Sequence, residues 1–223
     1  MHRYDEILAM AAERKGGFGA VLDDIPVPKS DEEIAAIPGE DWLAAMAEGI
    51  FQTGLAWTVV RNKWPGIEEA FHGFDVARVA MMSDDWFDAL LSDTRIIRSA
   101  PKVRAIQQNA VFIQEVEAEA GSFGRKIADW PKEDFAGLVQ WLKKNGSRLG
   151  GQVGAYTMRR MGVDSFIMSG SVVARLIAEG VVSKSPSSQK DWAAVQAAFN
   201  TWAEQSGESL TTISRMLAKS IDV

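Results

Sequence analysis

The chain has 223 residues, a formal net charge of −6, 47% hydrophobic residues, no cysteine and two histidines. This length and hydrophobic content suit one folded domain, or a helical domain with an extension, and argue against disorder. A chain without cysteine has no disulfide, thiolate nucleophile or cysteine-bound zinc, and His2 and His72 alone make a Ser-His-Asp triad or a histidine metal site improbable. No segment approaches the ~20 apolar residues of a membrane span and no signal peptide is recognisable, so we expect a cytoplasmic protein.

Apolar residues recur at spacings of three and four along nearly the whole chain, which predicts an all-α fold. In chain order, we expect a first helix ending at Gly16-Gly17, a short helix near Glu33, a long helix over residues 42–62 capped by Asp41 and closed by Pro65-Gly66, short helices at 67–72, 76–81 and 84–91, a helix from Pro101 to about 120, and one from Pro131 to about 144. After a glycine-rich turn, a Ser/Pro linker at 183–188 precedes a helix with Trp192, Phe199 and Trp202, and a last helix starts at Ser209.

Basic residues concentrate in two windows that contain no acid. Residues 141–163 include Lys143, Lys144, Arg148, Arg159 and Arg160, and residues 94–114 include Arg95, Arg98, Lys102 and Arg104. Since salt screens exposed charges beyond ~8–10 Å, local clusters of this kind decide whether an acidic protein can bind phosphates. The windows indicate a phosphate-facing surface, and the alternative is a set of ordinary solvated helix faces.

The segment LGGQVGAYT, residues 149–157, has the layout of a helix-hairpin-helix. Backbone amides at the start of a helix bind a phosphate without reading the base, and glycine allows the phosphate to approach closely. A glycine-rich turn between helices can also be only a turn, but its place inside a basic window favours DNA binding. We therefore predict that duplex DNA is contacted by Lys144, Arg148, Gly150, Gly151, Gly154 and Arg159.

Three further segments carry a resemblance to a known family. QTGLAW at 52–57, FHGFD at 71–75 and DTRIIRSAPKVRAIQQN at 93–109 resemble, in order and spacing, the runs QAGLSW, FHxFD and IIRxxxKIxAxxxNA of the 3-methyladenine DNA glycosylase I family. Weaker similarity continues to about Arg175. The resemblance implies a helix-hairpin-helix DNA glycosylase-like helical domain over residues 1–223, with a divergent N-terminal segment at 1–38 and a C-terminal helical extension at 189–223. The implied reaction is hydrolysis of the N-glycosidic bond of an alkylated base flipped from duplex DNA.

A pocket for such a base needs an aromatic ring to stack on it and an anion that favours its positive charge. We expect Glu48, Gln52 and Trp57 on the predicted 42–62 helix to recognise the base. The family places a base-contacting Glu eight residues before the Trp; that slot is Gly49 here, and Glu48 is turned from it by about 100° on a helix. Trp57 can alternatively be a core residue, and Phe51 is expected in the core.

The expected reaction has no assigned catalytic residue. Many members of the superfamily place an Asp shortly after the hairpin, but residues 168–175 contain no acid, as in the resembling family, and Asp164 reads as a cap or turn residue. No lysine occupies the hairpin position that lyases use, so we expect a monofunctional enzyme. The resembling family holds a zinc with two Cys and two His, a site that this chain cannot form, and we expect no metal or cofactor. The tail could instead pack four apolar side chains where the metal would be: Trp192, Val195, Phe199 and Trp202.

The sequence thus favours a monomeric DNA glycosylase acting on 3-methyladenine or a similar cationic lesion in double-stranded DNA, as in base excision repair. The alternative is a non-catalytic DNA- or lesion-binding protein that retains the fold. A helical interaction domain without nucleic acid is a third hypothesis, which the two acid-free basic windows disfavour.

Overall fold

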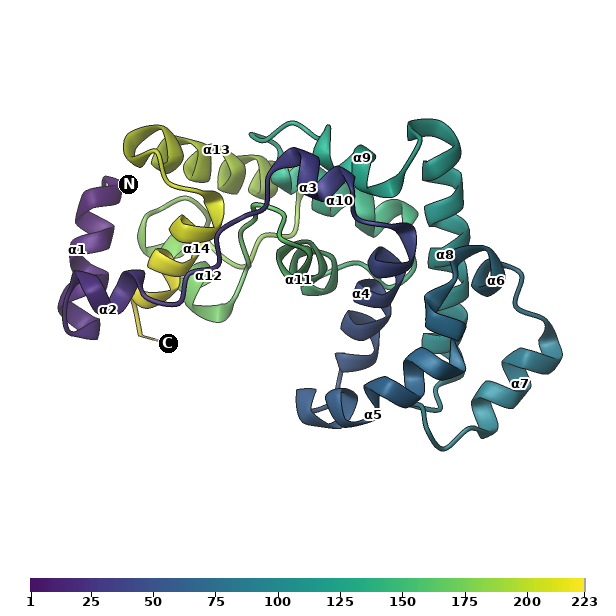
Figure 1. Ribbon diagram of the computed structural model, residues 1–223. Coiled ribbons are helices and arrows are strands. Elements are labelled where there is room, and N and C mark those ends of the chain that lie inside the picture. Colours follow the sequence, from purple (N-terminus) through teal and green to yellow (C-terminus); the bar gives the residue numbers. More distant parts are fainter. Residues whose placement is uncertain (223) are drawn as a thin grey trace. The chain divides into compact units, whose positions relative to one another are not determined.

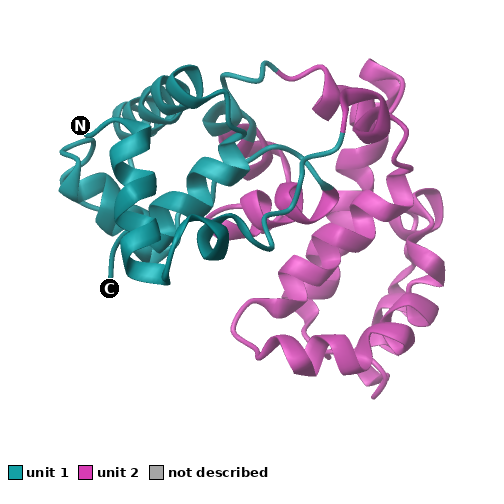
Figure 2. Ribbon diagram, turned by 60° about the vertical axis from the view of Figure 1, so that its left-hand side comes forward, with its two compact units in different colours: residues 1–29, 131–138, 162–223 teal, residues 30–130, 139–161 magenta. Residues whose placement is uncertain are grey.

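The computed structural model describes residues 1–222, and these residues form helices and turns without any strand (Figure 1). The expected all-α class is confirmed. The chain divides into two compact units, each assembled from segments distant in sequence (Figure 2). Unit 1 comprises Met1–Lys29, Pro131–Leu138 and Gly162–Val223, and unit 2 comprises Ser30–Trp130 and Val139–Met161.

Unit 1 is built from the two ends of the chain. Its helices are α1 (Tyr4–Lys15), α2 (Phe18–Leu22), α12 (Gly170–Ala178), α13 (Gln189–Ser206) and α14 (Leu210–Lys219). The tail supplies much of the core, since Val195, Phe199 and Trp202 are fully buried, and Phe199 stacks on Phe166 with ring centroids 4.3 Å apart. The prediction that the tail packs apolar side chains is confirmed for these three residues, and Trp192 is half-buried.

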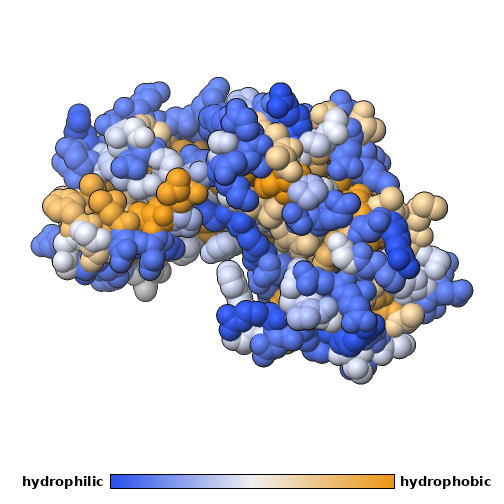
Figure 3. Space-filling view, in the orientation of Figure 1, coloured by the Kyte–Doolittle hydropathy of each residue, from blue (hydrophilic) through white to orange (hydrophobic). Residues whose placement is uncertain are grey.

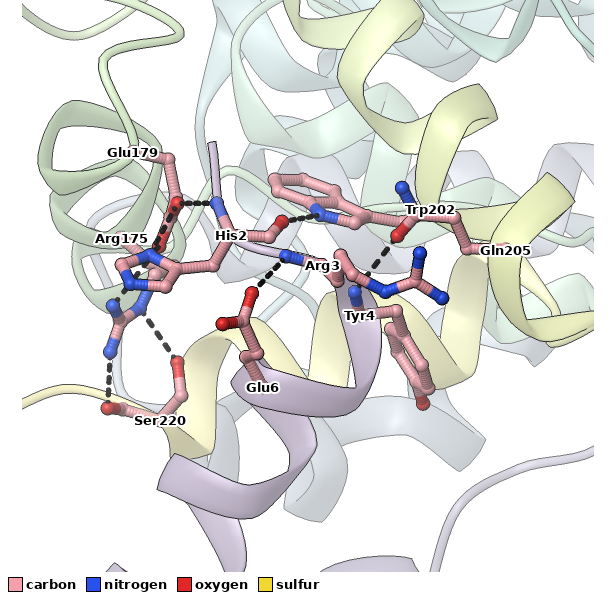
Figure 4. A network of polar contacts seen from close by, with 9 residues as sticks. All are labelled: His2, Arg3, Tyr4, Glu6, Arg175, Glu179, Trp202, Gln205 and Ser220. Atoms are coloured by element: carbon pink, nitrogen blue, oxygen red, sulfur yellow. Dashed lines mark hydrogen bonds and ion pairs between the residues drawn. The ribbon is translucent and has the colours of Figure 1, made fainter.

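A polar network ties the start of the chain to this core (Figure 4). The backbone N–H of His2 donates to Glu179 Oε2 at 2.6 Å, and the indole N–H of Trp202 donates to the carbonyl of His2 at 3.1 Å. Glu179 also pairs with Arg175 at 3.2 Å, and Arg175 donates to Ser220 Oγ at 2.8 Å. Glu179 and Arg175 are each 7% exposed, so their charges are largely removed from water and are balanced within the network.

Unit 1 also exposes an apolar patch, seen as orange atoms at the left of Figure 3. Phe18, Leu22 and Val27 are exposed by 57%, 46% and 87%. The prolines at 26 and 28 keep this segment extended and deny it the donors a helix needs, so its apolar side chains stay at the surface.

Unit 2 contains α3 (Asp31–Ala35), α4 (Gly39–Gln52), α5 (Trp57–Ala70), the 3₁₀ turn η1 (His72–Phe74), α6 (Val76–Ala80), α7 (Asp84–Ser92), α8 (Ala100–Ala120), α9 (Phe123–Ala128) and α11 (Gln152–Met161). Helix α10 (Phe135–Asn145) begins in unit 1 and continues in unit 2. One predicted helix start is wrong, and one helix was not predicted. Pro131 lies before a turn and not in the first turn of α10, because Asp134 accepts a hydrogen bond from the N–H of Gly137 and the helix starts there. The helix that was not predicted is α9.

The expected long helix over 42–62 is wrong. Helix α4 ends at Gln52, and α5 begins at Trp57 after a break at 53–56. Gly54 adopts φ 76°, in the left-handed region that ends helices, and the last carbonyls of α4 are bonded by a side chain outside the helix. Conversely, Pro65 does not end a helix: it lies inside α5, where its missing N–H costs one hydrogen bond to the carbonyl of an exposed residue.

Aromatic side chains join α4, α8, α9 and α10 in the core of unit 2. Trp42 packs on Phe123 with ring centroids 5.3 Å apart, and Phe112 packs on Trp141 at 5.1 Å. Trp42 and Phe123 are fully buried, as is Phe51 on α4, so the prediction that Phe51 is a core residue is confirmed. This core holds α4 and α8 in place, and α11 packs on α4.

Candidate nucleic-acid and base-binding site

Helices α10 and α11 form a hairpin through the turn at residues 146–151, the layout predicted from the sequence. Gly151 has φ 62°, a conformation that favours glycine. Gly154, in the first turn of α11, donates its N–H to the carbonyl of Leu149 at 3.1 Å. A Cβ at position 154 would lie 2.6 Å from that oxygen, so the turn can fold against α11 only with glycine there. The hairpin glycines therefore have a structural reason for being glycine, besides any role toward a ligand.

The cations of this basic window divide into two groups. Lys144 and Arg148 are exposed at the hairpin, and Arg148 has φ 58°, in the left-handed region that few non-glycine residues adopt. Arg159 is half-buried on α11. Arg160 instead pairs with Glu48 of α4, so its charge is balanced within unit 2.

The second basic window is used for internal contacts. Arg95 pairs with Glu69 and Asp93 at 2.8 Å each, Lys102 donates to two carbonyls at the end of α4, and Arg104 lies 4.1 Å from the ring centroid of Phe87. These contacts neutralise or occupy three of the four cations that the sequence left unopposed. Phosphate binding by these three cations stays a prediction. Asp93 lies just before the window in sequence, whereas Glu69, Phe87 and the carbonyls at the end of α4 come from other elements.

Trp57 is not a core residue. Its side chain is 60% exposed at the start of α5, beside Leu55, which is 39% exposed in the 53–56 break. The ring of Trp57 contacts that of Tyr156 on α11, edge to face, with centroids 6.3 Å apart and an interplanar angle of 87°. Sequence reasoning did not single out Tyr156, although it stands inside the hairpin motif. The sequence did contain a signal for it: Tyr156 lies four residues before Arg160 and therefore on the same face of α11.

Glu48, Gln52 and Arg160 form a closed polar triad next to this pair of rings along α4 and α11. Arg160 Nη1 lies 3.0 Å from Glu48 Oε2, and Arg160 Nη2 donates to Gln52 Oε1 at 2.9 Å. Gln52 Nε2 donates to Glu48 Oε1 at 2.8 Å, four residues back on α4. Glu48 and Arg160 side chains are 30% and 25% exposed. Glu48 was predicted from the sequence to recognise a cationic base. Its carboxylate is already paired with the guanidinium of Arg160.

Gly49 lies where α11 packs most closely on α4. A Cβ at this position would lie 3.2 Å from Val153 Cγ1 and 3.3 Å from Thr157 Oγ1. Both distances are tighter than ordinary van der Waals contact, so a longer side chain would push the two helices apart. The slot next to Glu48 is consequently filled by α11 rather than open for an acid.

Residues after the hairpin have structural roles. Asp164 accepts hydrogen bonds from the N–H groups of Leu210 and Thr211 at 3.0 and 2.8 Å and so caps α14, which agrees with its interpretation as a cap. Ser169 caps α12 by accepting from the N–H of Val172. These two polar side chains satisfy helix N-termini within unit 1.

The residues present do not fit the zinc site of the family that the sequence resembles. The chain has no cysteine, His2 bonds Glu179, and residues 1–222 contain no group of three histidine, aspartate or glutamate side chains able to hold a metal. In the same span, no helix is both long and apolar enough to cross a membrane.

Comparison with known proteins finds a family match in the central part of the chain. Residues 43–137 match the methyladenine glycosylase family, a span that includes most of α4, the break at 53–56 and α8. The family match thus covers the central part of the chain and not its two ends. DNA-3-methyladenine glycosylase 1 of Escherichia coli (strain K12) is 35% identical over 72 residues, 32% of this chain and 38% of the relative. DNA-3-methyladenine glycosylase of Haemophilus influenzae is 39% identical over 59 residues, 26% of this chain and 32% of that protein. These matches span about a third of the length of each relative.

Solved structures share the fold. The 3-methyladenine DNA glycosylase I of Staphylococcus aureus superposes with a TM-score of 0.51 at 20% identity, covering 69% of this chain and 91% of that one. The 8-oxoguanine DNA glycosylase of Thermotoga maritima gives a TM-score of 0.51 at 16% identity, covering 97% of this chain and 95% of that one. The expected DNA glycosylase fold is thereby confirmed, and the second likeness extends over nearly the whole chain, including both terminal segments.

Proposed function

We propose that this protein is a monofunctional DNA glycosylase that removes alkylated bases such as 3-methyladenine from duplex DNA by hydrolysing the N-glycosidic bond. The observation that carries the proposal is the packing, within unit 2, of α4 from the family-matched span against α11 of the helix-hairpin-helix. The hairpin supplies a surface for a phosphate backbone. The rings of Trp57 and Tyr156, in contact with each other, supply an aromatic surface for a base.

Duplex binding rests on the hairpin. The amides at Gly150 and Gly151 precede α11, where the partial positive charge of a helix start favours phosphate, whereas the N–H of Gly154 is bonded to Leu149 within the turn. Lys144, Arg148 and Arg159 add positive charge on the same two helices and their turn. Contacts of this kind bind DNA regardless of sequence, which suits an enzyme that must search for rare lesions.

Base recognition is assigned to Glu48, Gln52 and Trp57. An N3-alkylated adenine in DNA carries a positive charge that weakens its glycosidic bond, so discrimination requires aromatic stacking and a nearby anion more than strong catalysis. Trp57 and Tyr156 offer the stacking surface, and Gln52 offers amide atoms beside it. Glu48 contributes its charge as part of the triad with Arg160. Water attacks the sugar carbon, and residues 168–175 supply no acid for that step.

The deciding experiment measures the release of free bases from methylated duplex DNA, with 3-methyladenine and 7-methylguanine resolved by chromatography. A 3-methyladenine peak well above spontaneous depurination supports the proposal. Absence of release from protein that still binds duplex DNA contradicts it. An uncleaved strand after base release confirms that the enzyme lacks lyase activity, as expected from Gly150, Gly151 and Gln152 at the hairpin position where a lyase needs lysine.

A non-catalytic lesion-binding protein is the second candidate. Two observations favour it: α11 closes the space beside Gly49, and Glu48 already has a guanidinium partner. Such a protein would bind duplexes containing a methylated base more tightly than undamaged duplexes, yet release no base. The same chromatographic assay, combined with binding to both duplexes, separates the two candidates.

A further inference from the structure

Two side chains of α8 reach two different segments of the proposed DNA-binding face. Lys102 Nζ donates to the carbonyls of Phe51 at 3.0 Å and Thr53 at 2.7 Å, at the point where α4 gives way to the 53–56 break. Asn109 Nδ2 donates to the carbonyl of Ser147 at 3.0 Å, and the N–H of Ser147 donates to Asn109 Oδ1 at 2.7 Å. Seven residues separate Lys102 from Asn109, which places them on one face of the helix, two turns apart.

Asn109 is the buried anchor of the hairpin. It is fully buried, and both polar atoms of its amide are used by the backbone of one residue, Ser147. The next residue, Arg148, holds the left-handed φ of 58°, which a non-glycine residue keeps only where its surroundings impose it. By fixing both backbone groups of Ser147, Asn109 sets the conformation from which the Arg148 side chain projects.

Lys102 likewise fixes the backbone at the end of α4, where the break at 53–56 begins. The last carbonyls of a helix have no partners within it and carry partial negative charge, so an ammonium group that bonds them caps the helix. Burial and the nearby Arg148 guanidinium lower the pKa of Lys102, which agrees with an ammonium placed inside the fold beside the hairpin. The bond to Thr53 fixes the direction in which the chain leaves α4 toward Leu55 and Trp57.

We propose that Lys102 and Asn109 are positioning residues: from one face of α8 they hold the break at 53–56, which precedes Trp57, and the hairpin at 146–151 at a fixed spacing for duplex DNA. The DNA part of this inference rests on the proposed function. Lys102 therefore acts on DNA through the backbone of α4 and not as a phosphate ligand, although it belongs to a basic window. Asn109 acts through Ser147 and Arg148.

The test uses the full chain with Asn109→Leu and Lys102→Met, which keep the size of each side chain and remove its hydrogen bonds. Gln107→Met is the matched control, since Gln107 is on the same helix and its amide bonds the carbonyls of Ala80 and Met82, outside the hairpin and the break. Amide hydrogen exchange is measured well below the melting temperature. Asn109→Leu is expected to raise exchange about tenfold at Ser147 and Gly154, and Lys102→Met at Thr53 and Leu55, while Gln107→Met changes neither pair.

Duplex affinity measured as a function of salt supplies the second arm. Both positioning variants are expected to lower affinity about tenfold with an unchanged slope of log K against log salt, because no phosphate contact is removed. A slope that falls by about one in Lys102→Met indicates a direct phosphate contact and overturns the positioning role of Lys102. Unchanged hydrogen exchange in the variants overturns positioning whatever the DNA result. A wild-type chain that binds no duplex refutes the proposed function and the DNA role of both residues, and the exchange arm still decides whether they hold the two segments.

Discussion

The ring of Trp57 meets that of Tyr156 nearly at right angles, at 87° with centroids 6.3 Å apart, so the start of α5 is fixed against the hairpin helix α11. Trp57 comes from the family-matched span and Tyr156 from the helix-hairpin-helix. The contact therefore links the two parts of unit 2 on which base recognition and DNA binding are proposed to depend. An edge-to-face pair of this kind leaves much of the exposed indole available for stacking.

Trp57→Ala is expected to change the free energy of unfolding by less than about 1 kcal/mol, because the side chain is 60% exposed. Release of 3-methyladenine should fall strongly in the same variant, since the stacking surface is removed. Denaturant unfolding and the base-release assay measure the two effects. Trp42→Ala is the control: this ring is fully buried, and its loss should cost about 3–5 kcal/mol. A large loss of stability in Trp57→Ala, with activity per folded molecule retained, would contradict the binding role.

Introducing an acid at position 49 is expected to damage the fold instead of improving base recognition. The Cβ and carboxylate of Gly49→Glu would enter the space held by Val153 and Thr157, and overpacking of this kind costs about 1–3 kcal/mol. Denaturant unfolding checks the stability, and base release checks the activity. Gly19→Ala is the control, because nothing lies within 4 Å of its Cβ position. A stable Gly49→Glu variant with raised activity would show that α11 can move away from the slot.

The helix boundaries that the sequence predicted correctly are those with local signals. The end of α1 is marked by Gly16 in the left-handed conformation, the start of α8 by Pro101 in its first turn, and the start of α14 by Ser209 accepting a bond from Thr212. The break between α4 and α5 was missed because apolar spacing continues through it. Gly54 is a weak signal by itself, and the carbonyls at the end of α4 are bonded by Lys102, a residue of a later helix.

The same distinction applies to the candidate site. The hairpin could be predicted since the glycines that allow its turn are neighbours in sequence. The distant partners of charged residues could not: Glu48 reads as an available acid, yet Arg160 of α11 pairs with it, and Arg95 pairs with Glu69 of α5 as well as with the neighbouring Asp93. Charge pairing depends on which elements pack together, and sequence windows contain no information on that.

Glu179→Gln is expected to destabilise unit 1 by about 1–3 kcal/mol at neutral pH, since it removes the charge and replaces one of the two oxygens that accept from His2 and Arg175 by an NH2 donor. Burial raises the pKa of Glu179, but the hydrogen bonds from His2 and Arg175 lower it more, and the pKa lies below its ordinary 4.5 in the folded protein. The stabilisation is thus present above pH 4.5 and is lost as the pH falls through the folded-state pKa. Unfolding measured from pH 7 down should show a smaller loss in the variant than in wild type, with exposed Glu204→Gln behaving as wild type.

Charge reversal at the hairpin, Lys144→Glu with Arg148→Glu, is expected to weaken duplex binding for every sequence and to flatten its dependence on salt. If each side chain neutralises one phosphate, the slope of log K against log salt should fall by about two. Stability should change little, since both side chains are exposed. The control variant, Lys184→Glu with Lys190→Glu, has the same net charge but carries the changes at exposed sites in unit 1. Equal weakening in the two variants would mean that overall charge, and not the hairpin, governs DNA binding. An unchanged slope in the hairpin variant would remove Lys144 and Arg148 from the interface.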